Sequence, residues 1–161
     1  MSYENIKDKE LHRVALTAIV YRSDMKFLIV RRALDKKVYP GKWTVPGGGL
    51  NVDDYINKPP TSGGDQWYDA LEDALRREVR EETNVEMGKP KYLCDVAFIQ
   101  KNGTPVIVLS YYASYVSGMV KLDEENIDYQ WVSVDELGNY DLIPGIVDEI
   151  KTVYKLVFMT I

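Results

Sequence analysis

The chain has 161 residues, of which 45% are hydrophobic and 28% are charged, and its net charge is −5. These values are typical of one soluble globular domain, and the negative charge argues against a binder of duplex nucleic acid, which usually carries a basic face. The single Cys94 excludes an internal disulfide, and the single His12 excludes a histidine-rich metal site. No apolar run approaches the ~20 residues of a membrane span, so we expect no membrane partner and a cytoplasmic protein.

The first half of the chain predicts a hairpin and a glycine-rich segment. Apolar, β-rich runs cover residues 11–21 and 26–31 and flank a Ser-Asp turn. A short strand over residues 43–46 leads into the glycines at 47–49. Residues 50–68 contain paired prolines and paired glycines, which predict a long loop.

The second half predicts a helix, a second hairpin and two later helical segments. The first helix covers residues 69–83, and the hairpin pairs residues 92–100 with 105–115 across an Asn-Gly turn. The remaining expected elements are a strand over 129–132, a short helix over 134–137, a terminal helix over 146–156 and an apolar end at 157–161. Strands and helices in this order suit an α/β fold with a sheet covered on both faces.

The helical pattern places carboxylates where apolar side chains belong. At ~100° per residue, Glu78 and Glu82 fall inside the arc of apolar side chains and Glu81 lies on its flank. The apolar arc itself consists of Leu71, Leu75 and Val79. Buried carboxylates are rare unless a positive charge compensates them, and Mg²⁺ binds through carboxylate oxygens. The pattern therefore predicts a metal-binding helix, and a solvated Arg/Glu-rich helix is the alternative.

This helix and its surroundings resemble the signature of the Nudix hydrolases. The signature reads Gly, five residues, Glu, seven residues, Arg-Glu, an apolar residue, any residue, Glu-Glu, any residue, Gly and an apolar residue. The positions that match it are Arg77, Glu78, Val79, Glu81, Glu82 and Val85. The flanking segments that support the resemblance are Leu28–Arg32, Pro40–Leu50 and Tyr129–Leu137.

Two positions depart from the signature, and an insertion interrupts it. The isolated Glu falls on Asp69, and the late Gly falls on Asn84, for which we expect the left-handed conformation that Asn tolerates. The leading Gly falls by spacing on Gly63, although the Pro46–Gly48 run normally supplies it. The extra residues extend from Asn51 to Gln66 and separate the glycines from the helix.

The resemblance implies a single domain over residues 1–161, with a Nudix-like α/β/α sandwich, a mixed β-sheet and an inserted loop at 50–68. The implied reaction is metal-dependent hydrolysis of a diphosphate linkage in a nucleoside diphosphate linked to another moiety. Nucleoside triphosphates and nucleotide sugars are the expected substrates. The implied ligands of Mg²⁺ (or Mn²⁺) are Glu78, Glu81, Glu82 and the backbone carbonyl of Gly47.

The resemblance also implies roles for other residues. Arg77 would pair with Asp69 and orient the helix. Glu78 and Glu125 are both candidates for the group that removes a proton from water, and a solvated acidic loop is the alternative for Glu125. Further residues flank the glycines or lie in the insertion, where they either contact the substrate or serve only the surface and the loop: Arg31, Arg32, Lys42, Trp67 and Tyr68.

Two other functions remain open. A catalytically silent Nudix module would bind a nucleotide without turnover. An enzyme similar to isopentenyl-diphosphate isomerase would need an active-site cysteine and histidine ligands, whereas Cys94 falls in an expected strand and His12 stands alone. For both the hydrolase and the silent module, the expected partner is a small-molecule nucleotide. The sequence also leaves open a homodimer.

Overall fold

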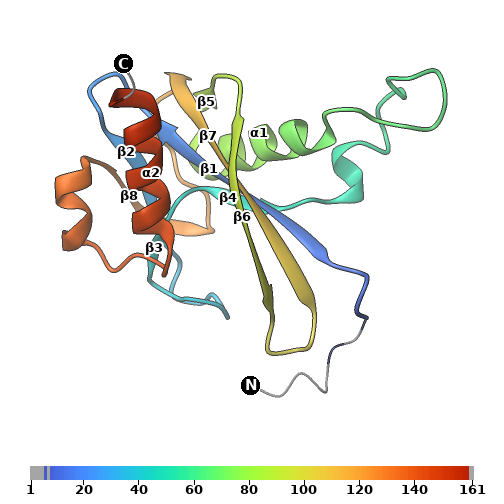
Figure 1. The fold of residues 1–161 in the computed structure, drawn as a ribbon, viewed down its shortest axis with the longest axis horizontal. Coiled ribbons are helices and arrows are strands. Elements are labelled where there is room, and N and C mark those ends of the chain that lie inside the picture. Colours follow the sequence, from blue (N-terminus) through green and yellow to red (C-terminus); the bar gives the residue numbers. More distant parts are fainter. Residues whose placement is uncertain (1–5, 7, 160–161) are drawn as a thin grey trace.

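The computed structural model describes residue 6 and residues 8–159, which form a mixed sheet with helices on both faces (Figure 1). The strands are β1 (Arg13–Tyr21), β2 (Phe27–Arg32), β3 (Trp43–Thr44), β4 (Gly47–Gly49), β5 (Glu86–Met87), β6 (Lys91–Ile99), β7 (Pro105–Ser117) and β8 (Asn126–Val132). The helices are α1 (Ala70–Thr83) and α2 (Ile146–Phe158), with short 3-10 segments η1 (Val52–Asp54) and η2 (Val134–Asn139).

Strand β1 lies at the centre of the sheet and pairs along its whole length. It runs parallel to β7 and antiparallel to β2 and β4. Strand β7 also pairs with β6 and β5, while β2 pairs with β8 and β3. Both predicted hairpins are confirmed, as β1–β2 and β6–β7. The two-residue strand β5 was not predicted from the sequence, since so short an element has no periodicity of its own.

Alternation along the strands divides the core into two layers, because successive side chains of a strand point to opposite faces. On one face, Leu16, Ala18, Val20 and Leu28 pack with Ala74, Leu75 and Val79 of α1. On the other face, Ile19, Phe27 and Ile29 pack with Ile146, Ile150 and Val153 of α2 and with Leu137 of η2. This arrangement is the predicted α/β/α sandwich.

The terminal helix is longer than the apolar pattern predicted. It continues to Phe158, whose ring packs edge-on against Tyr21 at 5.7 Å and against Phe27 at 6.3 Å between ring centroids. Part of the apolar end is therefore core, while residues 160–161 lie outside the described residues. Across the part of the chain that the structure describes, the helices lack the length and the apolar character required to cross a bilayer.

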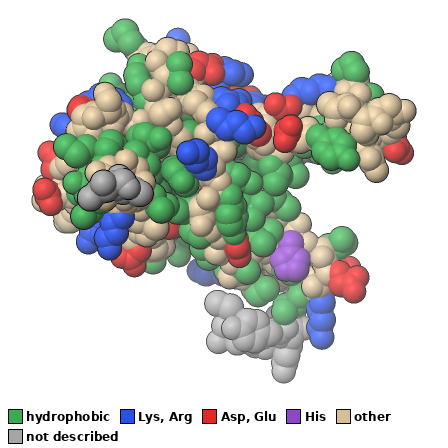
Figure 2. Space-filling model, turned by 45° about the horizontal axis from the view of Figure 1, so that its top comes forward, with side chains coloured by type: hydrophobic (Ala, Val, Ile, Leu, Met, Phe, Trp, Pro, Cys, Tyr) green, Lys and Arg blue, Asp and Glu red, His purple; other side chains and the backbone are tan. Residues whose placement is uncertain are grey.

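Between η1 and α1 the chain forms an arm of turns and bends that projects away from the sheet (Figure 1). Inside the arm, the ring of Trp67 packs on Tyr55 at 5.4 Å, and its Nε1 donates a hydrogen bond of 2.8 Å to the Lys58 carbonyl. Figure 2 shows the arm standing clear of the body, with acidic and basic side chains gathered at its base.

Helix α1 ends at Asn84, which has the left-handed conformation predicted for it, with φ of 60° and ψ of 20°. The Asn84 side-chain amide donates to the Met119 carbonyl at 3.0 Å, and the Lys121 N–H donates to the Thr83 carbonyl at 3.0 Å. The end of the helix is therefore attached to residues 119–121, which lead into the acidic run at 123–125.

Candidate functional site

Helix α1 places two glutamates against the glycine strand β4. The carboxylate of Glu82 accepts a hydrogen bond of 3.1 Å from the Gly47 N–H. The carboxyl group of Glu78 occupies the space beside Gly48, where a methyl group on Gly48 would overlap all three carboxyl atoms. Gly48 therefore has to be a glycine for Glu78 to approach the strand this closely. Glycines and carboxylates that are distant in the sequence thus meet at one place.

Arg77 pairs with Asp54 and not with Asp69, so that expectation was wrong. The Nε and Nη2 atoms of Arg77 donate to both carboxylate oxygens of Asp54, the second at 3.1 Å. The Arg77 guanidinium, helped by the Asn51 N–H, holds the pKa of the Asp54 carboxyl below its ordinary value. Asp69 is exposed and directly precedes α1, with φ of 60° and no side-chain cap bond.

The spacing of the signature explains the error. Asp54 stands six positions after Gly48, which is the interval between the leading glycine and the isolated acid. The extra residues therefore lie between Asp54 and Arg77, and not between the glycines and the acid. Counting backward from Arg77 assumed an unbroken interval and reached Asp69. Counting forward from Gly48 would have found Asp54 in the sequence.

The charge of the buried carboxyl groups is disfavoured in the absence of a cation. Burial raises the pKa of Glu82 to about 8; the Gly47 N–H opposes this shift, and the Glu78 and Asp123 carboxylates add to it. Burial also raises the pKa of Glu78, and the Arg77 guanidinium opposes the shift. Carboxyl groups are therefore crowded where the helix meets β4, and each disfavours the ionised form of its neighbour.

As placed, the described residues contain no group of three acidic, histidine or cysteine side chains close enough together to hold a metal ion. Glu78 and Glu81 both turn toward Nη1 of Arg77, at 2.9 and 3.0 Å, while Glu82 faces the Gly47 N–H. The donors are nevertheless all oxygen, as hard divalent cations require, and a cation would compensate their crowded charge. The chemistry of these donors therefore suits a divalent cation, although the described side chains do not converge on one point in this structure.

Asp123 is the late-loop acid whose charge acts on this cluster, and sequence reasoning missed it. Burial raises the pKa of Asp123, Lys36 lowers it, and Glu81 raises it further. The expected residue, Glu125, instead forms an ion pair with Lys36, and its backbone carbonyl accepts the Ala33 N–H at 3.0 Å. Spacing in the acidic run could not decide which of its carboxylates acts electrostatically on the glutamates of α1.

The basic residues proposed for substrate contacts are occupied by protein partners. These contacts are Arg31 Nε to the Gly41 carbonyl at 2.9 Å, Arg32 Nε to the Val38 carbonyl at 3.0 Å, and Lys42 Nζ to Asp141 at 2.9 Å. Burial lowers the pKa of Arg32, and the Glu82 carboxylate partly offsets this, so Arg32 is the one whose charge reaches the cluster. The other two stabilise the turn around residues 38–42.

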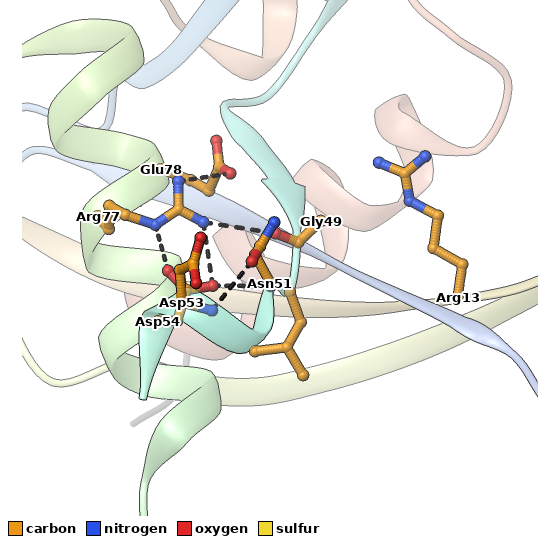
Figure 3. Close-up of a pocket in the computed structure, with 8 residues that line it drawn as sticks. Arg13, Gly49, Asn51, Asp53, Asp54, Arg77 and Glu78 are labelled. Atoms are coloured by element: carbon orange, nitrogen blue, oxygen red, sulfur yellow. Dashed lines mark hydrogen bonds and ion pairs between the residues drawn. The ribbon is translucent and has the colours of Figure 1, made fainter. Parts of the chain in front are cut away.

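A pocket of about 440 Å³ lies beside Glu78 (Figure 3). Its walls come from β1, β4, η1 and α1, and its charged lining residues are Arg13, Asp53, Asp54, Arg77 and Glu78. Trp67 and Tyr68 do not line it. Trp67 is engaged inside the arm, and Tyr68 is 66% exposed to solvent. The structure therefore does not bring these two aromatic residues to the glutamates.

Comparison with known proteins gives consistent matches. The NUDIX domain model matches residues 11–156. Nucleoside triphosphatase NudI from Escherichia coli (strain K12) is 29% identical over 135 residues, covering 75% of this chain and 82% of that protein. The MutT protein from Methanosarcina mazei Go1 has a TM-score of 0.69 and 27% identity, covering 93% of this chain and 98% of that one. A MutT NUDIX hydrolase from Burkholderia pseudomallei has a TM-score of 0.69 and 24% identity, covering 89% and 99%.

Proposed function

Because this chain belongs to the NUDIX domain family and is a Nudix-type pyrophosphohydrolase, we propose that it hydrolyses nucleoside triphosphates to nucleoside monophosphate and pyrophosphate. The observation that carries this proposal is the packing of Glu78 and Glu82 against the glycine strand. The similarity to a protein named nucleoside triphosphatase supports a triphosphate over a nucleotide sugar, which is the second candidate substrate.

In the proposed reaction, water forms a bond to the phosphorus next to the nucleoside, and the bond from that phosphorus to the bridging oxygen breaks. The residues that would hold Mg²⁺ or Mn²⁺ are Glu78, Glu81, Glu82, the Gly47 carbonyl and, from the late loop, Asp123. When bound, such a cation neutralises phosphate charge and lowers the pKa of water.

Arg77 is a positioning residue in this proposal. Its two-point contact with Asp54 fixes the guanidinium between η1 and α1, from where it holds Glu78 and Glu81. The carboxylate that accepts the proton of water is either Glu78, which lines the pocket, or Asp123, which takes the place first expected of Glu125. Asp69 has no part in the proposed site.

The test is a substrate panel with the full chain. Nucleoside triphosphates, nucleotide sugars and dinucleotides are incubated with Mg²⁺ or Mn²⁺, and products are identified by ³¹P NMR. Hydrolysis in ¹⁸O-labelled water then shows which phosphorus is attacked. We expect nucleoside monophosphate and pyrophosphate from at least one triphosphate, with the label in the monophosphate. Saturable binding without turnover would identify a silent module, and allylic isomerisation would identify an isomerase; either result contradicts the proposal.

A further inference from the structure

Arg13, the first residue of β1, is the unpaired cation on the wall of the pocket. The other arginine of the pocket, Arg77, is engaged with three carboxylates. Arg13, in contrast, makes no side-chain hydrogen bond or ion pair with any residue that the structure describes. Figure 3 shows its guanidinium standing apart from the bonded group around Arg77, on the other side of the Gly49 strand.

The pairing of β1 with β4 brings Arg13 to this position. Ala15 pairs with Gly49, and the Leu50 N–H donates to the Val14 carbonyl at 2.9 Å. The Arg13 guanidinium then lies over Gly49, where an added Cβ would be 2.9 Å from Nη2. The missing side chain at Gly49 thus makes room for Arg13, just as the missing side chain at Gly48 makes room for a carboxylate.

Because neighbouring residues of a strand face opposite sides, Gly48 presents the carboxylate side of β4 and Gly49 presents the guanidinium side. Glu78 and Arg13 therefore lie on opposite sides of one short glycine strand and line one pocket. One ligand in this pocket can therefore meet both the carboxyl group and the guanidinium, because both side chains line it.

Arg13 is the cation in the described pocket lining that protein carboxylates do not already hold. The pocket's other charged groups are the carboxylates of Asp53, Asp54 and Glu78 and the guanidinium of Arg77, which pairs with Asp54 and Glu78. The basic residues around the glycine loop already bind protein atoms: Arg31, Arg32, Lys36 and Lys42. Arg13 is the pocket-lining guanidinium left to bind an anion, and its planar donors suit phosphate oxygens in a two-point contact.

We propose that Arg13 binds the terminal phosphate of the substrate and thereby selects triphosphates over nucleotide sugars. The inference rests on the proposed function and names the substrate group that this residue recognises. A terminal phosphate carries a charge of about −1.5 to −2 near neutral pH, whereas a phosphate esterified to a sugar carries about one negative charge. The terminal phosphate therefore gains most from an unpaired guanidinium, and a sugar in its place loses that contact.

The experiment compares Arg13→Gln with Arg22→Gln, which removes the same charge just beyond the other end of β1. Arg22 pairs with Asp24 and lies over the Trp131 ring at 4.6 Å, so it serves as a control for charge and strand. Binding of inorganic pyrophosphate is measured by calorimetry with and without Mg²⁺. Kinetic constants are measured for a nucleoside triphosphate and a nucleotide sugar.

We expect Arg13→Gln to weaken pyrophosphate binding about tenfold and to raise KM for the triphosphate about tenfold, which corresponds to about 1.4 kcal/mol. The kcat should change less than threefold, and KM for the nucleotide sugar less than twofold. Gly49→Ala keeps every charge but displaces the Arg13 guanidinium, so it should raise the triphosphate KM in the same direction. Arg22→Gln should leave all these values near those of the wild type.

Two results would overturn the proposal: unchanged pyrophosphate binding in Arg13→Gln, or equal losses for the triphosphate and the nucleotide sugar. Thermal melting of each variant checks that the fold is intact. The binding measurement needs no turnover, so it separates failure of this proposal from failure of the proposed function. Loss of pyrophosphate binding in a chain that hydrolyses no nucleotide would support the phosphate site and contradict the hydrolase.

Discussion

Arg77 of α1 binds both carboxylate oxygens of Asp54, a residue 23 positions earlier in the chain. The Asp54 side chain is only 3% exposed, whereas that of Arg77 is 32% exposed. This contact joins the segment after the glycine strand to the helix that carries the glutamates. An almost buried carboxylate of this kind depends on its partner, because a buried charge without compensation is costly.

The first prediction concerns the two aspartates that compete for the role of isolated acid. Asp54→Asn should lower the free energy of unfolding by about 3 kcal/mol, because it breaks the almost buried two-point ion pair between Asp54 and Arg77. It should also lower kcat, since Glu78 and Glu81 lose a fixed Arg77. The matched change Asp69→Asn should stay within about 0.5 kcal/mol, as expected for an exposed side chain. Urea unfolding measures the stability of the two variants, and turnover assays measure their kcat. Equal effects of the two substitutions would show that the Asp54–Arg77 contact does not determine stability or activity.

The second prediction concerns acid stability. Because Arg77 holds the pKa of Asp54 below its unfolded value, the unfolded chain binds more protons than the folded chain as the pH falls through this range. The stabilisation is therefore complete above the unfolded pKa of about 4 and is lost as the pH falls through the lower folded pKa. The stability difference between wild type and Asp54→Asn should shrink below about pH 4. Denaturant melts from pH 7 to pH 3 test this, and a constant difference would contradict it.

The third prediction compares Glu82 with Glu72, a glutamate on the same helix. Glu82→Gln should reduce Mg²⁺-dependent turnover at least a hundredfold, about 2.7 kcal/mol, because it removes a charged oxygen ligand. Melting without metal should not fall, since burial already disfavours the Glu82 charge. Glu72 pairs with Arg76 and Lys89, so Glu72→Gln should cost a little stability and change the rate only a few-fold.

Metal binding gives a second measurement for the same variants. Added Mg²⁺ should raise the melting temperature of the wild type and of Glu72→Gln, but not that of Glu82→Gln. Corresponding changes at Glu78 and Glu81 should behave like Glu82→Gln. Small and similar effects at all four positions would mean that the run is a solvated charged helix, and the hydrolase proposal would fail with it.

The fourth prediction separates the two late-loop acids. Asp123→Asn should lower the rate at least tenfold, because the Asp123 charge acts on Glu81 and Glu82. Glu125→Gln breaks an exposed ion pair with Lys36, which should cost no more than about 1 kcal/mol of stability and leave the rate nearly unchanged. Turnover and melting of the two variants decide between them. A larger rate loss in Glu125→Gln would restore that residue as the functional acid.

The fifth prediction concerns the left-handed residue at the end of α1. Asn84→Val should destabilise the protein by about 1–3 kcal/mol, because a β-branched side chain resists a φ of 60°. Asn84→Gly should change stability by less than about 1 kcal/mol, since easier backbone geometry offsets the lost hydrogen bond to the Met119 carbonyl. Thermal unfolding of both variants is the measurement. A Val variant as stable as the Gly variant would contradict this account.

Features that depend on neighbouring residues could be predicted from the amino-acid sequence alone. The 3.6-residue period placed Glu78 and Glu82 on the inner face of α1, and the Asn-Gly turn defined the β6–β7 hairpin. The left-handed Asn84 could be predicted because tolerance of positive φ is a property of the residue itself. These features were predictable because local periodicity, turn chemistry and backbone preference act over a few residues.

Contacts between side chains that are distant in the sequence became known from the three-dimensional packing. It paired Arg77 with Asp54 across the arm, brought the charge of Asp123 to act on the glutamates while Glu125 paired with Lys36, and left Arg13 unpaired beside Gly49. Counting from the glycines would have reached Asp54, and the resemblance would then have implied its pairing with Arg77, but no local pattern shows that the two segments meet. The number of residues between two positions does not give their distance in space when an insertion or a loop lies between them. That distance is set by the packing of the whole sheet and its two helical layers.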